Sequence, residues 1–130
     1  MSEETVSVLL YSDDANRRNA VIEGVGKRPA KDVPPITWLE AATAEGAVIV
    51  FEEQKPEILV LDAESYKVGG MAVAKELQNE HDATQPVVLL TARPQDNWLA
   101  KWAGAVEIVG DPLDPLELQE ALARVIRGLR

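Results

Sequence analysis

The stretch "EILVLDAESYKVGG", residues 57–70, contains the feature on which the fold depends. Ile58 to Leu61 form an apolar run with the length and composition of a buried strand. The run ends at Asp62, and a polar loop closed by Gly69 and Gly70 follows. An acidic residue at the carboxyl end of a buried strand either takes part in chemistry or merely ends the strand, and the rest of the chain bears on that choice.

The composition is that of one ordinary globular domain. The chain has 130 residues, of which 46% are hydrophobic and 27% are charged. This length is enough for one domain with a core, so we expect a single domain over residues 1–130 and no effector domain. The sequence has no apolar stretch of the roughly 20 residues that span a membrane, and no signal-peptide pattern. We therefore expect a cytoplasmic protein.

Charge and residue types argue against several functions. The net charge of -9 argues against nucleic acid as a partner, because phosphate binding needs a basic surface. The absence of cysteine excludes disulfides, thiolate zinc sites and cysteine nucleophiles. His81 lies alone in a polar turn, and no Ser-His-Asp arrangement or phosphate-binding glycine loop is present. We therefore expect a protein that is not an enzyme.

Strand and helix patterns alternate along the whole chain. Apolar runs of strand length occur at 6–11, 36–41, 58–61, 87–90 and 105–109. Hydrophobic residues recur at helical spacing around 21–25, 44–51, 70–79, 98–103 and 115–129. The last helix is the clearest, because Asp114 is a capping residue and Pro115 suits the first helical position. This alternation predicts an α/β fold with a mainly parallel sheet and helices on both faces.

Short polar residues follow four of the five predicted strands. They are Ser12 and Asp13 after the first strand, Asp62 after the third, Thr91 after the fourth and Asp111 after the fifth. A polar residue after one strand usually marks only a turn. Because ligands of open parallel sheets bind beyond the carboxyl ends of the strands, the coincidence across four strands predicts a pocket.

This pattern resembles the receiver domain of two-component response regulators over essentially the whole chain. The stretches "LLYSDDANRR" and "TARPQDNW" are most similar to small stand-alone receivers of actinobacteria. The resemblance implies a flavodoxin-like, doubly wound sheet of five parallel strands in the order 2-1-3-4-5. It also implies that Asp62 is the phosphoaccepting aspartate, that Thr91 is the hydroxyl residue, and that Gly70 opens the third helix. Pro112 matches the proline that follows the fifth strand.

Several positions depart from the family pattern. Ser12 stands where the first residue of an acidic pair is expected, and Tyr66 takes a position that is commonly proline. Asp111 replaces the lysine that precedes Pro112, and Ile108 takes the place of the switch aromatic. Whether the Asp111–Pro112 bond is cis, as in the family, is left open by the sequence.

The resemblance implies a Mg²⁺ ion held by Asp13, Asp62 and the backbone carbonyl of Glu64. Alternatively, Asp111 joins the other two aspartates in holding Mg²⁺ or Ca²⁺, or one of these carboxyls is protonated or solvated at the rim.

The exchange of lysine for Asp111 matters most for the chemistry. Two unit charges about 4 Å apart interact by about 4 kcal/mol at an effective dielectric constant of about 20. Exchanging attraction for repulsion therefore disfavours a phosphoryl group by several kcal/mol. No replacement cation is evident nearby in the sequence, where Lys67 and Arg93 are the candidates in the flanking loops.

Two functions remain. In the first, an atypical receiver acts as a signalling or accessory protein-interaction module, independently of phosphorylation. In the second, Asp62 accepts a phosphoryl group from a histidine kinase or a small phosphodonor. Asp111 favours the first.

Trp98 and Trp102 lie four residues apart on one predicted helical face and are the candidate interface, with core packing as the alternative for one of them. The resemblance to stand-alone receivers implies a larger complex as the partner, and respiratory NADH:quinone oxidoreductase is the candidate.

Overall fold

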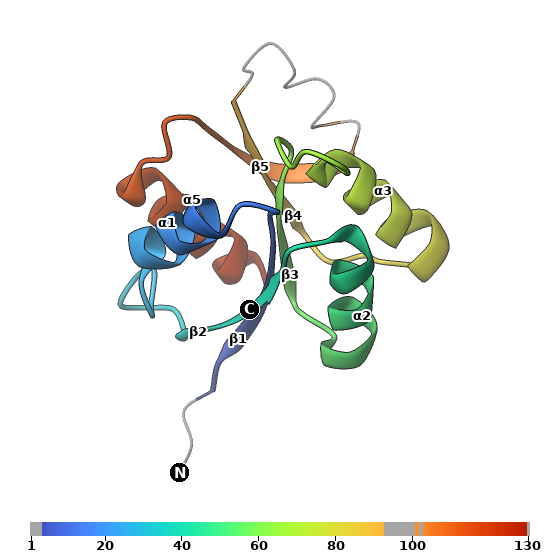
Figure 1. Cartoon of the computed structure of the whole chain (residues 1–130). Helices are drawn as coiled ribbons and strands as arrows, with labels where there is room; N and C mark the ends of the chain where they lie inside the picture. Colours follow the sequence, from blue (N-terminus) through green and yellow to red (C-terminus); the bar gives the residue numbers. More distant parts are fainter. Residues whose placement is uncertain (1–3, 93–100, 102, 130) are drawn as a thin grey trace.

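All five strands run parallel in one sheet, in the order β2-β1-β3-β4-β5, which confirms the predicted topology (Figure 1). This computed structural model describes residues 4–92, 101 and 103–129. Within these residues the strands are β1 (Val6–Tyr11), β2 (Ile36–Ala41), β3 (Ile58–Asp62), β4 (Val87–Thr91) and β5 (Ala105–Gly110). The helices are α1 (Ala15–Val25), α2 (Ala44–Gln54), α3 (Gly70–His81) and α5 (Pro115–Leu129). The helix predicted around 98–103 lies largely outside the described residues.

Each face of the sheet carries its own hydrophobic core. Helices α1 and α5 cover one face, and α2 and α3 cover the other (Figure 1). Along β3, Ile58 and Val60 pack into the first core, whereas Leu59 and Leu61 pack into the second. A strand buried on both faces must be apolar at every position. This requirement explains why β1, β3 and β4 read as continuous apolar runs.

Aspartate side chains cap the starts of α1 and α5, and the cap of α5 is the predicted one. Asp14 is the N-cap of α1, and its side chain accepts hydrogen bonds from the backbone N–H groups of Asn16 and Arg17. Asp114 accepts a hydrogen bond from the N–H of Leu116 at the start of α5. The Asp14 cap holds the first turn of α1 directly above the carboxyl end of β1, and this position governs where Arg17 points.

The start of α3 lies against the end of β3. A Cβ atom added at Gly70 would lie 2.8 Å from the backbone carbon of Leu61 and 2.9 Å from that of Asp62. Only glycine allows the two backbones to come this close. The helix was predicted to end at Asn79 but continues to His81. The next residue, Asp82, has a left-handed backbone conformation and ends it.

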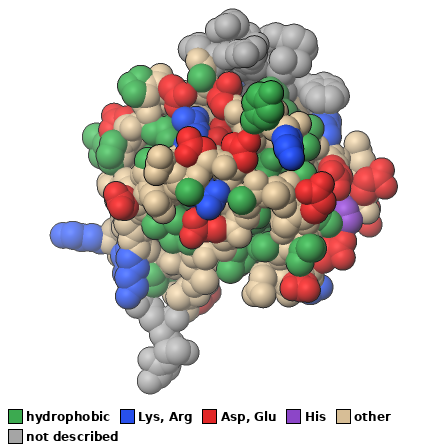
Figure 2. Space-filling model, viewed as in Figure 1, with side chains coloured by type: hydrophobic (Ala, Val, Ile, Leu, Met, Phe, Trp, Pro, Cys, Tyr) green, Lys and Arg blue, Asp and Glu red, His purple; other side chains and the backbone are tan. Residues whose placement is uncertain are grey.

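The surface of the molecule is acidic. Figure 2 shows Asp and Glu side chains spread over the viewed face, consistent with the net charge of -9. Over the described residues, no helix has both the length and the apolar character needed to cross a membrane.

Candidate functional site

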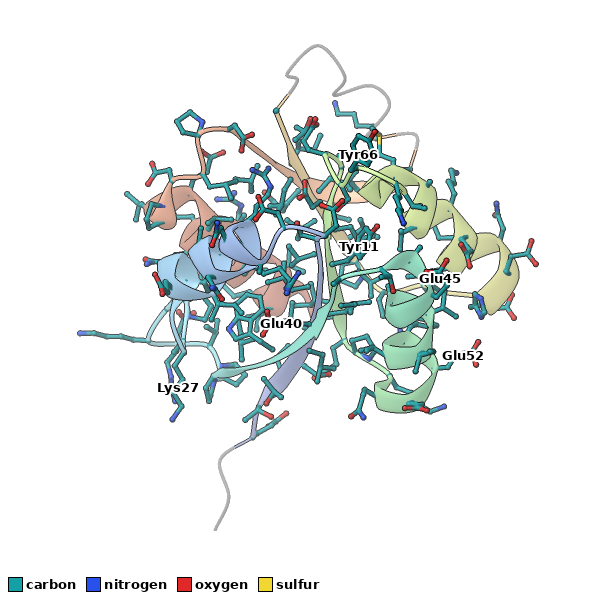
Figure 3. All side chains as sticks on the ribbon, in the orientation of Figure 1. Tyr11, Lys27, Glu40, Glu45, Glu52 and Tyr66 are labelled. Carbon is teal, nitrogen blue, oxygen red and sulfur yellow. The ribbon has the colours of Figure 1, made fainter. Side chains whose placement is uncertain are left out.

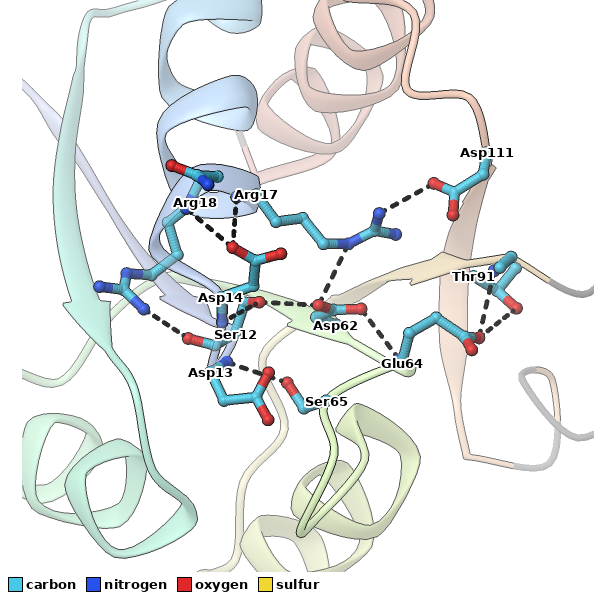
Figure 4. Close-up of polar contacts among 12 residues, drawn as sticks. Ser12, Asp13, Asp14, Arg17, Arg18, Asp62, Glu64, Ser65, Thr91 and Asp111 are labelled. Atoms are coloured by element: carbon cyan, nitrogen blue, oxygen red, sulfur yellow. Dashed lines mark hydrogen bonds and ion pairs between the residues drawn. The ribbon is translucent and has the colours of Figure 1, made fainter.

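The carboxyl ends of the strands bring the five predicted pocket residues to one rim (Figure 4). Ser12, Asp62 and Thr91 are buried, with Asp62 only 1% exposed, whereas Asp13 and Asp111 are exposed. The backbone N–H of Asp111 donates to the Thr91 carbonyl at 3.0 Å, which joins the ends of β4 and β5. The Asp111–Pro112 bond is cis. The predicted convergence therefore occurs.

Both oxygens of the Asp62 carboxylate are engaged by groups of the chain itself. The Ser12 hydroxyl donates to Oδ2 at 2.7 Å, and the Arg17 Nε lies 3.1 Å from the same oxygen. The backbone N–H of Glu64 donates to Oδ1 at 2.9 Å. A buried carboxylate needs such partners, because an unpaired charge is costly to remove from water. Asp62 is thus paired and enclosed in this structure.

Arg17 is the cation that sequence reasoning missed. Its Nη1 lies 3.0 Å from Asp111 Oδ1, so one guanidinium bridges Asp62 and Asp111 (Figure 4). The sequence showed no replacement cation near Asp62 or Asp111, and the structure supplies one from α1. Of the two candidates named from the sequence, Lys67 lines a cavity that Asp13 also lines, and Arg93 lies outside the described residues.

Arg17 reaches the rim because it lies in the first turn of α1, whose cap, Asp14, is fixed beside Ser12. The Asp14 N–H donates to the Ser12 hydroxyl at 3.1 Å. Arg18, the next residue, donates through Nη1 to the Ser12 carbonyl at 2.7 Å and pairs with Glu40 on β2. The two neighbouring arginines therefore hold opposite sides of the loop after β1. The Nε and Nη2 atoms of Arg17 are buried and make no hydrogen bond among the described residues, so the contact of Nε with Asp62 is an ion pair without hydrogen-bond geometry.

Asp13 organises the loop that follows β3. Its Oδ2 accepts a hydrogen bond from the N–H of Tyr66 at 2.6 Å, and its own N–H donates to the Ser65 hydroxyl at 3.1 Å. The Tyr66 side chain is 92% exposed and stands at the surface of the loop (Figure 3). The acid retained from the family pair thus has a structural task here.

These contacts bear on the predicted magnesium site. Receiver domains typically bind Mg²⁺ where they are phosphorylated, through carboxylate and carbonyl oxygens. Here the Asp62 and Asp13 oxygens accept hydrogen bonds, and one Asp62 oxygen also faces a guanidinium. The described part of the chain contains no group of three or more acidic or histidine side chains arranged for a metal. The residue types are those that Mg²⁺ prefers, but a guanidinium and hydrogen-bond donors compete for the same oxygens, so binding through Asp13, Asp62 and the Glu64 carbonyl stays a prediction.

The side chain of Glu64 has a role that the sequence did not indicate. Its Oε2 accepts hydrogen bonds from the Ala92 N–H at 3.1 Å and from the Thr91 hydroxyl at 3.4 Å. Sequence reasoning considered only the backbone carbonyl of this residue. No signal in the sequence singled out this side chain, because its contact is with the end of another strand.

A cavity of about 370 Å³ lies beside the pocket, between the end of β1, the start of α2 and the loop after β3. Tyr11, Glu45 and Tyr66, which Figure 3 labels, are among the residues that line it. The Tyr11 hydroxyl donates to the Val68 carbonyl. Burial, and to a lesser extent the negative charges of Asp13 and Asp62, raise the pKa of Tyr11 above its usual 10.0.

The chain is similar to known response regulators over nearly its whole length. It is 34% identical over 127 residues to an uncharacterised response regulatory protein of Mycobacterium tuberculosis, an alignment that covers 98% of this chain and 96% of that protein. This chain therefore belongs to the response-regulator family and is a receiver domain. The mycobacterial match also agrees with the predicted similarity to actinobacterial receivers. No family model matches the chain.

Solved structures share the fold at lower sequence identity. Chemotaxis protein CheY4 of Vibrio cholerae has a TM-score of 0.78 at 20% identity, covering 94% of this chain and 99% of that one. The receiver domain of the Francisella response regulator 1452 has a TM-score of 0.81 at 16% identity, covering 96% and 99%. The flavodoxin-like receiver fold is thereby confirmed.

Proposed function

We propose that this receiver is a signalling or accessory module that binds a protein partner independently of phosphorylation at Asp62. The observation that carries the proposal is the closure of Asp62 by Arg17, Ser12 and the Glu64 N–H. To accept a phosphoryl group, an Asp62 oxygen would have to give up at least one of these contacts. The rim would then hold the phosphoryl charge beside Asp13, Glu64 and Asp111.

The bridge formed by Arg17 gives the pocket a stable arrangement without a bound ion. Opposite charges at about 3 Å attract, more strongly at the buried Asp62 than at the exposed Asp111, and one guanidinium pairs with both carboxylates. Asp111 is therefore the second anchor of Arg17. This pairing supports a receiver that keeps its shape without phosphorylation.

A second candidate is supported by the same cation. Arg17 could neutralise a phosphoryl group on Asp62 if it turned from the carboxylate to the new oxygens, as arginine does at many phosphate sites. Thr91 is also present at the end of β4. In this case the domain would be phosphorylated by a histidine kinase or a small phosphodonor, and partner binding would follow phosphorylation.

Partner capture by matched variants separates these functions. We infer that Trp98 and Trp102, which lie outside the described residues, form part of the contact, and that the partner belongs to a larger complex, with NADH:quinone oxidoreductase as the candidate. Equal amounts of four proteins would be immobilised on a resin and incubated with an extract of the source organism: wild type, Asp62→Asn, Trp98→Ala and Trp102→Ala. We expect Asp62→Asn to capture the partner as well as the wild type does and a tryptophan variant to capture less. The reverse ranking would support the phosphoacceptor.

A further inference from the structure

Glu64 connects the ends of two neighbouring strands. Its backbone N–H donates to Asp62 Oδ1 at the end of β3, and its carboxylate accepts from Thr91 and Ala92 at the end of β4 (Figure 4). Thr91 is 4% exposed, whereas Glu64 itself is exposed. The side chain therefore folds from the surface back onto donors at the rim.

The two donors are those that an oxyanion would use. A hydroxyl and a backbone N–H on consecutive residues can bind one negatively charged oxygen together; here the Ala92 N–H at 3.1 Å is the main donor, and the Thr91 hydroxyl at 3.4 Å is a weaker one. The resemblance to receivers implies that, after phosphorylation, the threonine hydroxyl forms a hydrogen bond with an oxygen of the phosphoryl group. Here the Glu64 Oε2 has that place.

We propose that the Glu64 carboxylate is a built-in substitute for the phosphoryl group. It holds Thr91 and Ala92 in their bonded arrangement whatever the state of Asp62. The backbone hydrogen bond from the Glu64 N–H to Asp62 keeps the Glu64 carboxylate within reach of Thr91 and Ala92. This contact therefore needs no phosphodonor. Glu64 thereby fixes Thr91 and Ala92 at the end of β4.

The charge around Asp62 fits this role. Arg17 forms ion pairs with Asp62 and Asp111, and its buried Nε and Nη2 make no hydrogen bond among the described residues. This positive group lies on one side of Asp62, and the Glu64 backbone lies on the other. A phosphoryl group on Asp62 would compete with the Glu64 carboxylate for Thr91 and Ala92, and like charges would repel. The inference deepens the proposed function and rests on it for its biological meaning.

The backbone amide of Ala92 reports the contact directly. Its proton shift and its exchange rate with deuterium would be measured by NMR in wild type, Glu64→Ala, Glu64→Gln and the control Glu53→Ala. Glu53 is an exposed residue of α2, so its removal changes the net charge equally without touching the rim. We expect Glu64→Ala to move the Ala92 proton upfield and to speed its exchange about tenfold, the order expected for loss of a charge-assisted hydrogen bond. Glu64→Gln should lie between, and Glu53→Ala should match the wild type.

An Ala92 amide that does not change in Glu64→Ala would overturn the inference, as would an equal change in Glu53→Ala. Adding acetyl phosphate and Mg²⁺ to the wild type tests the proposed function separately from the role of Glu64. An adduct on Asp62 with an unmoved Ala92 amide would overturn the proposed function and leave the substitution by Glu64 standing. An adduct that also shifts the Ala92 amide would overturn both.

Discussion

The guanidinium of Arg17 lies within 3.1 Å of the Asp62 carboxylate and within 3.0 Å of the Asp111 carboxylate, so a cation on α1 joins the ends of β3 and β5. In the family, a lysine at the position of Asp111 supplies the positive charge. Here the acidic and basic roles have changed places: the strand end carries the acid, and the helix carries the base. The pocket remains paired in charge although its residues differ.

Removal of Arg17 should destabilise the fold. The buried Asp62 would lose its cation and keep only Ser12 and the Glu64 N–H as partners. We expect Arg17→Ala to lower the free energy of unfolding by about 2–4 kcal/mol, as for other buried ion pairs that lose one partner. Urea unfolding measures the change, with Arg127→Ala as the control because Arg127 and its partner Asp32 are both exposed and lie away from the pocket. Equal effects of the two variants would show that the Arg17–Asp62 pair contributes no more to stability than an exposed ion pair does.

Magnesium and Arg17 should compete for Asp62. The guanidinium contacts the oxygen that also accepts from Ser12, so a metal ion must displace it or bind beside it. We therefore expect millimolar Mg²⁺ to raise the melting temperature of Arg17→Ala more than that of the wild type, since binding to the folded state stabilises it. Differential scanning calorimetry with Mg²⁺ and with matched ionic strength of NaCl measures this difference. A larger response of the wild type would mean that Arg17 assists the metal.

Gly70 should tolerate no side chain. A Cβ atom there would lie 2.8 Å from the backbone of Leu61, which cannot move without shifting β3 and Asp62. We expect Gly70→Ala to lower the free energy of unfolding by about 1–3 kcal/mol. Gly128→Ala is the matched control: it lies in α5 with nothing within 4 Å of an added Cβ. It should be neutral or stabilising by up to about 1 kcal/mol, because alanine favours helices. If both variants unfolded alike, the close approach of α3 to β3 would be unimportant.

Tyr11 should make stability fall at alkaline pH. Because burial raises the pKa of Tyr11 in the folded state, the unfolded chain loses the phenolic proton first. The contribution of neutral Tyr11 is full below about pH 10 and declines as the pH rises through the folded pKa. Tyr11→Phe should cost about 1 kcal/mol at neutral pH, because Val68 loses a donor, and should lose less stability than the wild type on going to alkaline pH. Urea unfolding at neutral pH and at about pH 10.5 tests this, and parallel declines would contradict it.

Sequence patterns predicted the sheet because burial on both faces forces continuous apolar strands. They also placed Asp62 and Thr91 correctly, since the end of an apolar run is visible in one dimension. The bridge to Arg17 was missed because helical periodicity does not show which polar side chain of a helix reaches over a sheet. The sequence did contain a signal, because an unexpected acid at Asp111 occurs together with two arginines shortly after Asp14. This signal could be interpreted only once the position of α1 over the sheet was known. Glu64 was missed for the same reason, because its contact is with another strand.

The most direct test of a receiver closed by its own charges is the intact mass of the protein after incubation with acetyl phosphate and Mg²⁺. Wild type, Asp62→Ala and the double variant Arg17→Ala with Asp111→Lys would be compared, each shown by circular dichroism to be folded. We expect no phosphoryl adduct on the wild type and an adduct on the double variant, in which Asp62 is released and the family's lysine is restored. An adduct on the wild type that is absent from Asp62→Ala would contradict the proposal and identify this chain as a working phosphoacceptor.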